Sequence, residues 1–241
     1  MRAVFFDLDE TLLDHTSAVR VGAAALAKEL GHPNPAEAIE SWFALERHFF
    51  DRYLAGELSF LEQRRARVRG LAAEVGRELD DAEADAVFAT YFSHYQASWV
   101  AFPDVEACFA ELRTRADVRL GVVTNGDARG QRAKLARLGL LDAMDVVVTA
   151  EEVGCAKPDP RIYRAACERA GVPVEDAVMV GDRLDVDADG ARAAGLLGVW
   201  LDRGGQLSGA RHPAAHDGSR LVRISSLTEL PALVADGTGQ S

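Results

Sequence analysis

The sequence predicts an α/β fold: a parallel sheet covered by helices on both faces, with a helical segment inserted after the first strand. Three observations predict this fold. In the second half of the chain, short apolar runs of strand length alternate with amphipathic stretches of helix length. The strand-length runs are apolar on both faces, which is typical of buried parallel strands. Residues 15–99 show helical periodicity and contain no clear strand run.

The expected strands begin at the N-terminus and resume after the inserted segment. They cover residues 3–6, 119–123, 146–148, 177–180, 198–201 and 221–224. Helix signals lie between them. Asp159 followed by Pro160 suits an N-cap and first helical position, and Gly171 can end the helix that they begin. A further helix is expected to start near Asp127.

The inserted segment is expected to form a separate helical subdomain over residues 15–99, and residues 1–14 and 100–241 are expected to form the core. Four or so helices are predicted, over parts of residues 23–27, 42–53, 59–71 and 81–95. Glycine and proline positions such as Gly31, Gly56 and Gly76 separate them. Phe102, Pro103 and Asp104 mark the return to the core, where another helix follows.

Composition excludes several classes of protein. The formal net charge is -11, from 27 basic and 38 acidic residues, and this opposes binding to nucleic-acid polymers or anionic membranes. The three cysteines form no CxxC pair, so neither a disulfide framework nor a zinc site is expected. No apolar run has membrane-spanning length, and charge appears too early for a signal peptide. We therefore expect a cytoplasmic protein.

Polar side chains follow four of the expected strands, where each strand ends or in the loop beyond it. In chain order they are Asp7, Asp9 and Thr11, then Thr124, Asn125 and Gly126, then Lys157, and finally Asp182 and Asp187. Open α/β sheets bind ligands at the carboxyl ends of their strands. If the sheet is parallel, these groups converge at one edge and assemble carboxylates, a hydroxyl and an ammonium.

Taken in order, these segments resemble the four motifs of the haloacid dehalogenase (HAD) superfamily. The first motif is similar to Asp7-x-Asp9-x-Thr11, the second to Thr124, the third to Lys157, and the fourth to Gly181-Asp182 with Asp187. The resemblance implies a Rossmann-like core and an α-helical cap inserted after the first strand. Residues 124–126 and 151–158 look most like the capped phosphatase branch of pyrimidine 5'-nucleotidases and N-acylneuraminate-9-phosphatases.

The residue set suits hydrolysis of a phosphomonoester. A carboxylate that approaches a phosphate is repelled by roughly 4 kcal/mol at about 4 Å and an effective dielectric near 20. Mg²⁺ would cancel this repulsion, and we expect it on Asp7, Asp182 and, as the resemblance implies, the backbone carbonyl of Asp9. Asp7 is then the nucleophile that becomes an aspartyl-phosphate, and Asp9 the general acid and base.

The remaining residues are expected to hold the phosphate or to support the metal ligands. Thr124, the backbone N–H groups of Asn125 and Gly126, and the Lys157 ammonium are expected to hold phosphate oxygens. Thr11 and Asp187 are expected just outside the metal ligands, where Asp187 would orient a metal-bound water or Lys157. The expected partner is a small phosphorylated metabolite, such as a nucleotide or a sugar phosphate, bound by a monomer or a homodimer.

Four alternative functions stay open. A 2-haloacid dehalogenase is opposed by Asp9, because the resemblance implies that members displacing halide lack this second acid. A phosphomutase or phosphonate hydrolase would need a dedicated group in the inserted segment, where Lys28 is the only lysine available for a Schiff base. A phospho-acceptor signalling module, which is not an enzyme, is opposed by the long insertion and by the Asp7-x-Asp9 spacing.

Overall fold

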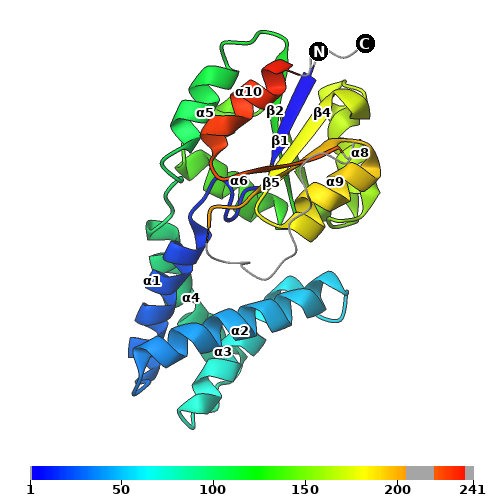
Figure 1. The fold of residues 1–241 in the computed structure, drawn as a ribbon. Coiled ribbons are helices and arrows are strands. Elements are labelled where there is room, and N and C mark those ends of the chain that lie inside the picture. The colour runs from blue at the N-terminus through cyan, green and yellow to red at the C-terminus, as the bar shows by residue number, and fades with distance from the viewer. Residues whose placement is uncertain (1, 205–219, 237–241) are drawn as a thin grey trace. The chain divides into compact units, whose positions relative to one another are not determined.

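The computed structural model describes residues 2–204 and 220–236, and its centre is one parallel sheet (Figure 1). The strands are β1 (Arg2–Phe6), β2 (Val118–Thr124), β3 (Val146–Thr149), β4 (Ala177–Gly181), β5 (Leu197–Leu201) and β6 (Leu221–Ile224). Their order is β3-β2-β1-β4-β5-β6, and every neighbouring pair is parallel. The predicted α/β class is confirmed, and each expected strand is present with ends that differ by at most one residue.

Helices follow the strands as crossover connections. They are α5 (Val105–Leu112), α6 (Ala128–Arg137), α7 (Ala150–Val153), α8 (Pro160–Ala170), α9 (Asp189–Ala194) and α10 (Leu230–Asp236). The expected signals for α8 are confirmed: the Asp159 side chain accepts from the N–H of Arg161, and Gly171 ends the helix with a φ of 68°. Asp127 caps α6, so this helix begins where the sequence predicted.

Helices cover both faces of the sheet. Successive side chains of a strand point to opposite faces, so neighbouring residues of β1 contact different helices. Phe5 packs in a cluster with Ile162 and Tyr163 of α8. The ring of the next residue, Phe6, lies 5.0 Å from the ring of Phe109 in α5. Figure 1 accordingly shows α8 and α9 on one side of the strands and α5 and α10 on the other. The buried core therefore holds the strand ends in place from both sides.

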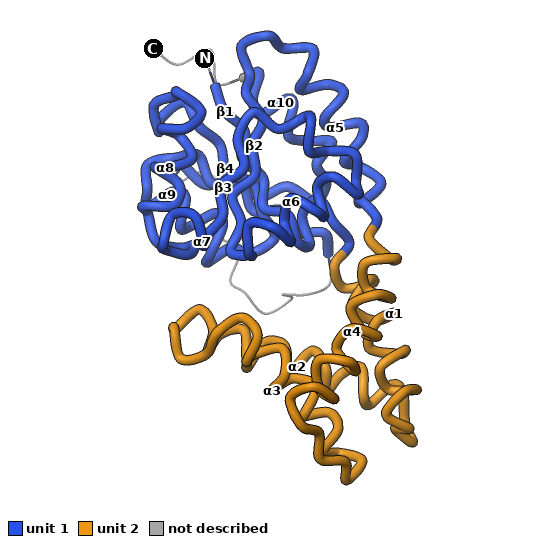
Figure 2. Tube along the Cα trace, turned by 180° about the vertical axis from the view of Figure 1, so that it is seen from behind, with its two compact units in different colours: residues 1–14, 100–241 blue, residues 15–99 orange. Residues whose placement is uncertain are grey.

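The chain divides into two compact units, one of residues 1–14 and 100–241 and the other of residues 15–99 (Figure 2). The second unit contains the expected inserted helices: α1 (His15–Leu30), α2 (Pro35–Leu54), α3 (Phe60–Glu74) and α4 (Asp81–Ala97). Ser59 and Asp80 form reciprocal capping boxes at the starts of α3 and α4. Among the described residues, no helix combines the length and apolar character needed to cross a membrane.

Candidate active site

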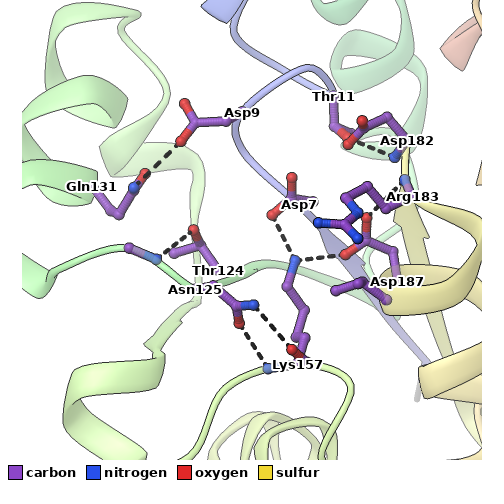
Figure 3. A network of polar contacts seen from close by, with 12 residues as sticks. Asp7, Asp9, Thr11, Thr124, Asn125, Gln131, Lys157, Asp182, Arg183 and Asp187 are labelled. Carbon is purple, nitrogen blue, oxygen red and sulfur yellow. Dashed lines mark hydrogen bonds and ion pairs between the residues drawn. The ribbon is translucent and has the colours of Figure 1, made fainter. Parts of the chain in front are cut away.

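The polar groups that follow β1, β2, β3 and β4 gather at the carboxyl edge of the sheet (Figure 3). Asp7 lies directly after β1, and its N–H still bonds the carbonyl of Val180 in β4 at 2.8 Å. Thr124 is the last residue of β2, the strand on the other side of β1. Parallel pairing thus brings together segments far apart in the sequence, and these residues lie near one another as the sequence predicted.

Lys157 is the central cation of this edge. Its Nζ donates to Oδ1 of Asp7 and to Oδ1 of Asp187, both at 2.6 Å, and its side chain is 3% exposed. Burial alone would lower the pKa of Lys157, but the carboxylates of Asp187 and Asp7 outweigh it and raise the pKa above its ordinary value. The ammonium therefore stays charged beside the carboxylate expected to act as the nucleophile.

Asn125 holds the backbone of Lys157 from the end of the neighbouring strand. Its Oδ1 accepts from the N–H of Lys157 at 2.7 Å, and its Nδ2 donates to the carbonyl of Lys157 at 3.0 Å. The sequence assigned a role only to the backbone N–H of Asn125. In the structure, the side chain has a role of its own, because this pair of bonds fixes the peptide that carries the central cation.

Thr124 and Gly126 form the turn between β2 and α6. Thr124 is buried, and its Oγ1 accepts from the N–H of Gly126 at 3.3 Å. The Asp127 side chain then accepts from the N–H of Gly130 at 2.7 Å and so caps the helix. The turn therefore places a hydroxyl and the positive end of α6 at the same edge as Lys157, which suits an anionic ligand.

Three acidic residues lie close enough together to share one cation. Asp7, Asp182 and Asp187 each offer a carboxylate oxygen, and these oxygens all lie within 4.8 Å of one another. Gly181 permits the approach, because a Cβ at this position would lie 2.2 Å from Cγ of Asp187. Thr11 supports the group by accepting from the N–H of Asp182 at 3.2 Å. Asp187, expected outside the metal ligands, thus belongs to the cluster and also contacts Lys157.

The cluster carries more negative charge than Lys157 neutralises. Burial and the neighbouring Asp187 together raise the pKa of Asp7 to about 7, against the lowering effect of Lys157. Burial, Asp187 and Asp7 raise the pKa of Asp182 well above its ordinary value. Buried carboxylates that repel one another are stabilised by a cation, and carboxylate oxygens suit Mg²⁺. These residues therefore fit the metal that the sequence predicted.

Asp9 contacts α6 and is not part of the cluster of three carboxylates. Lys134 Nζ lies 2.7 Å from each of its two carboxylate oxygens, and Gln131 Nε2 lies 3.4 Å from Oδ2. Figure 3 shows the carboxylate directed toward Gln131 and not toward Asp7. The two expected catalytic carboxylates thus contact different cations, Lys157 and Lys134.

Comparison with known proteins identifies the family. Residues 1–195 match the haloacid dehalogenase-like hydrolases. The chain belongs to this hydrolase family. Relatives include the N-acylneuraminate-9-phosphatase of Homo sapiens, 34% identical with 97% of this chain and 94% of the relative covered, and the pyrimidine 5'-nucleotidase of Escherichia coli, 30% identical with 96% of each covered. The family and the branch predicted from the motifs are confirmed, and the protein is a hydrolase with phosphatases among its relatives.

Solved structures agree with this assignment. A 2-haloacid dehalogenase from Pseudomonas syringae is 29% identical with a TM-score of 0.70, and 99% of this chain and 100% of that chain are covered. A hydrolase of the HAD superfamily from Bacillus subtilis, bound to magnesium, has a TM-score of 0.80 at 21% identity, covering 97% and 98% of the two chains. The second likeness concerns the fold alone. Together they support the Rossmann-like assignment of the hydrolase.

Sequence reasoning about this hydrolase missed Gln131, Lys134 and the side chain of Asn125. The first two lie three residues apart on α6, so that they share a face of the helix. That spacing indicates a common neighbour but does not name it. Only the parallel pairing of β1 with β2 brings α6 next to the loop that contains Asp9.

Proposed function

We propose that this hydrolase is a Mg²⁺-dependent phosphomonoesterase that acts on a small phosphorylated metabolite through an aspartyl-phosphate at Asp7. The observation that carries the proposal is the buried contact of Asp7 with Lys157 inside a cluster of three carboxylates. An anionic nucleophile needs positive charge beside it to approach a phosphate, and Lys157 together with a cation on the three carboxylates would supply that charge. The names of the two relatives, a phosphatase and a 5'-nucleotidase, support the same reaction.

The metal would be held by Asp7 and Asp182, with Asp187 close by and the carbonyl of Asp9 as a further ligand. When bound, Mg²⁺ supplies positive charge that screens the phosphate from the attacking carboxylate. The chain's own residues complete the binding of the phosphate. Lys157 supplies a second charge, and Thr124 with the start of α6 supplies hydrogen-bond donors for phosphate oxygens.

The reaction consists of two displacements at phosphorus. An oxygen of Asp7 first forms a bond to phosphorus while the bond to the leaving alkoxide breaks, and Asp9 donates a proton to that alkoxide. Asp9 then accepts a proton from water, whose oxygen attacks phosphorus and releases Asp7 and inorganic phosphate. In an in-line displacement the leaving oxygen lies opposite the nucleophile, so the acid must act on the side of the phosphate that is far from Asp7.

Nucleotides and sugar phosphates are the proposed substrate classes. The relatives named above are a pyrimidine 5'-nucleotidase and an N-acylneuraminate-9-phosphatase, and they differ in the group that leaves. The strand-end residues bind the phosphate that both classes share. We assign selection of the leaving group to the helical unit of residues 15–99, acting as a cap. Turnover of a panel of nucleotides and sugar phosphates measures this selection directly.

Removal of the nucleophile tests the proposal. Asp7→Asn should lower kcat for p-nitrophenyl phosphate by at least about a thousandfold, because the acceptor of the phosphoryl group is lost. The matched control is Asp185→Asn, which changes an exposed acid paired with Arg183 and should keep full activity. EDTA should abolish turnover by the wild type, and Mg²⁺ should restore it. Full activity of Asp7→Asn would reject the assignment of the nucleophile.

A 2-haloacid dehalogenase is the second candidate, since a solved dehalogenase is 29% identical to this chain. A halide ion leaves without being protonated. A dehalogenase would therefore not need a general acid at Asp9. Purified enzyme should therefore release inorganic phosphate from phosphomonoesters in Mg²⁺ and no halide from 2-chloropropionate. Release of halide without Mg²⁺ would favour the dehalogenase instead.

A further inference from the structure

The contact between Asp9 and α6 is more than a surface ion pair. Lys134 is 7% exposed and Gln131 is 5% exposed, so both polar side chains are buried. Burying an ammonium is costly unless a counter-charge accompanies it, and the Asp9 carboxylate supplies that charge at 2.7 Å from Nζ on both oxygens. The pair is separated by 125 residues in sequence. Its two halves therefore meet only through the tertiary fold.

Within residues 2–204, three contacts from α6 restrict how the Asp9 carboxylate can turn. Lys134 contacts both oxygens equally, and Gln131 adds a donor on Oδ2 alone. A carboxylate held by donors on both oxygens is restricted in rotation as well as in position. Figure 3 shows it extended toward α6 on the side away from Asp7.

Gly126 provides the space in which Gln131 lies. A Cβ at position 126 would be 1.8 Å from Nε2 of Gln131, the atom that contacts Asp9. The backbone of the phosphate-binding turn therefore packs directly against one of the groups that hold Asp9. The oxygen of the Gln131 amide, Oε1, is buried and has no hydrogen-bond partner among the described residues.

One helix consequently defines two parts of the site. The start of α6 and the preceding turn carry Thr124 and Gly126, whereas its next turn carries Gln131 and Lys134. A rigid helix with an N-cap keeps these two sets in a constant relation. The location of the phosphate and the location of the proton donor are thereby coupled.

We propose that Lys134, assisted by Gln131, is a positioning residue that orients the Asp9 carboxyl for proton transfer to the leaving group. This inference rests on the proposed phosphatase function and extends it to a residue outside the four motifs. Lys134 acts through Asp9, so its contribution depends on how much the leaving group needs a proton. A good leaving group should depend on it little and a poor one strongly.

The test compares Lys134→Met with the wild type on two aryl phosphates in Mg²⁺. Phenol is a poorer leaving group than p-nitrophenol, so kcat/KM for phenyl phosphate should fall about 10- to 100-fold while kcat/KM for p-nitrophenyl phosphate falls less than about threefold. The comparison uses kcat/KM because Asp9 also acts in the hydrolysis of the aspartyl-phosphate, a step that the two substrates share. Lys134→Arg should recover part of the loss on phenyl phosphate, because a guanidinium can also contact both oxygens.

Two controls separate positioning from a purely structural role. Arg137→Met removes an exposed cation from the last turn of the same helix and should leave both rates unchanged. In an Asp9→Asn background, Lys134→Met should add less than about a twofold further loss on phenyl phosphate, because its target is already gone. Damage to the fold would instead lower the rates for both substrates equally. Lys134→Met would then cause its full loss of activity in the Asp9→Asn background as well.

These outcomes distinguish the two proposals. Equal losses on both substrates, full additivity with Asp9→Asn, or no loss at all would overturn the role of Lys134 and leave the phosphatase assignment intact. Absence of Mg²⁺-dependent turnover of either aryl phosphate by the wild type would overturn the proposed function itself.

Discussion

At the scale of single residues, the site is organised by which carboxylate contacts which cation. Lys157 contacts Asp7 and Asp187, whereas Lys134 contacts Asp9. Among the described residues, neither ammonium group forms an ion pair with Asp182. Burial and the neighbouring acids Asp187 and Asp7 raise the pKa of Asp182. We infer that Asp182 is the residue whose charge most requires the metal.

Asp182→Asn tests this inference through stability. Without metal, removal of one of three mutually repelling carboxylates should raise the melting temperature in EDTA by about 2–4 °C, the shift that about 1 kcal/mol produces in a chain of this size. Mg²⁺ should raise the melting temperature of the wild type but not that of the variant. Thermal unfolding with EDTA and with Mg²⁺ measures both effects. An equal shift by Mg²⁺ in the two proteins would contradict a metal site at Asp182.

At the scale of elements, α6 links the turn proposed to bind phosphate, residues 124–126, to the residues around Asp9. Its N-cap, Asp127, keeps the first turn closed by accepting from the N–H of Gly130. If this turn frays, both the backbone donors near Gly126 and the Gln131 amide lose their place. The stability of one short helix therefore bears directly on turnover.

Asp127→Ala and Asp80→Ala form a matched pair of N-cap deletions. Asp80 caps α4 in the helical unit, where its Oδ1 accepts from the N–H of Glu83 at 2.9 Å. Each variant should lose about 1 kcal/mol of unfolding free energy. Asp127→Ala should also lower kcat/KM for p-nitrophenyl phosphate about tenfold, whereas Asp80→Ala should keep it within about twofold. Urea unfolding and initial rates measure the two effects, and equal kinetic losses would contradict a special role for α6.

At the scale of the whole molecule, one ion pair connects distant parts of the core unit. Arg203, just after β5, donates to both oxygens of Asp104 at 2.7 and 2.9 Å and to the carbonyl of Thr11 at 2.9 Å. Asp104 also accepts from Ser226 and from the N–H of Leu227. The loop after β1, the start of α5 and the segment after β6 are thus held together.

The Asp104 contacts make part of the stability depend on pH. Partial burial would raise the pKa of Asp104, but the bonds from Arg203, Leu227 and Ser226 outweigh it and lower the pKa below 3.8. The stabilisation is therefore fully present above the unfolded-state pKa, about 3.9, and is lost as the pH falls through the lower folded-state value. Asp104→Asn lacks this contribution at every pH.

The difference in unfolding free energy between wild type and Asp104→Asn should consequently be largest near pH 6 and should shrink as the pH approaches about 3. Urea unfolding across this range measures it. The acidic residues that the two proteins share contribute equally to both, so they cancel in the difference. Asp185→Asn, at an exposed position, should show a difference from the wild type that does not change with pH. A difference that is constant with pH would contradict the assigned role of the Asp104 carboxylate.

The sequence by itself determined the order of strands and helices along the chain and the residues that follow the strands. Apolar runs mark buried strands locally, and N-caps such as Asp127 and Asp159 are read from neighbouring residues alone. Because the strands are parallel, the groups after them had to meet at one edge. The expected convergence of Asp7, Lys157 and Asp182 needed no further information.

Only the tertiary structure decided which side chains contact one another at that edge. Asp9 with Lys134 and Asn125 with Lys157 are pairs separated by 125 and 32 residues, and no local pattern encodes them. Their contacts depend on where each helix packs against the sheet and on which rotamers the surrounding core allows. The sequence shows which residue types follow each strand and so which groups the site contains. Packing decides which of these side chains contact one another, because packing alone brings residues remote in sequence within hydrogen-bond distance.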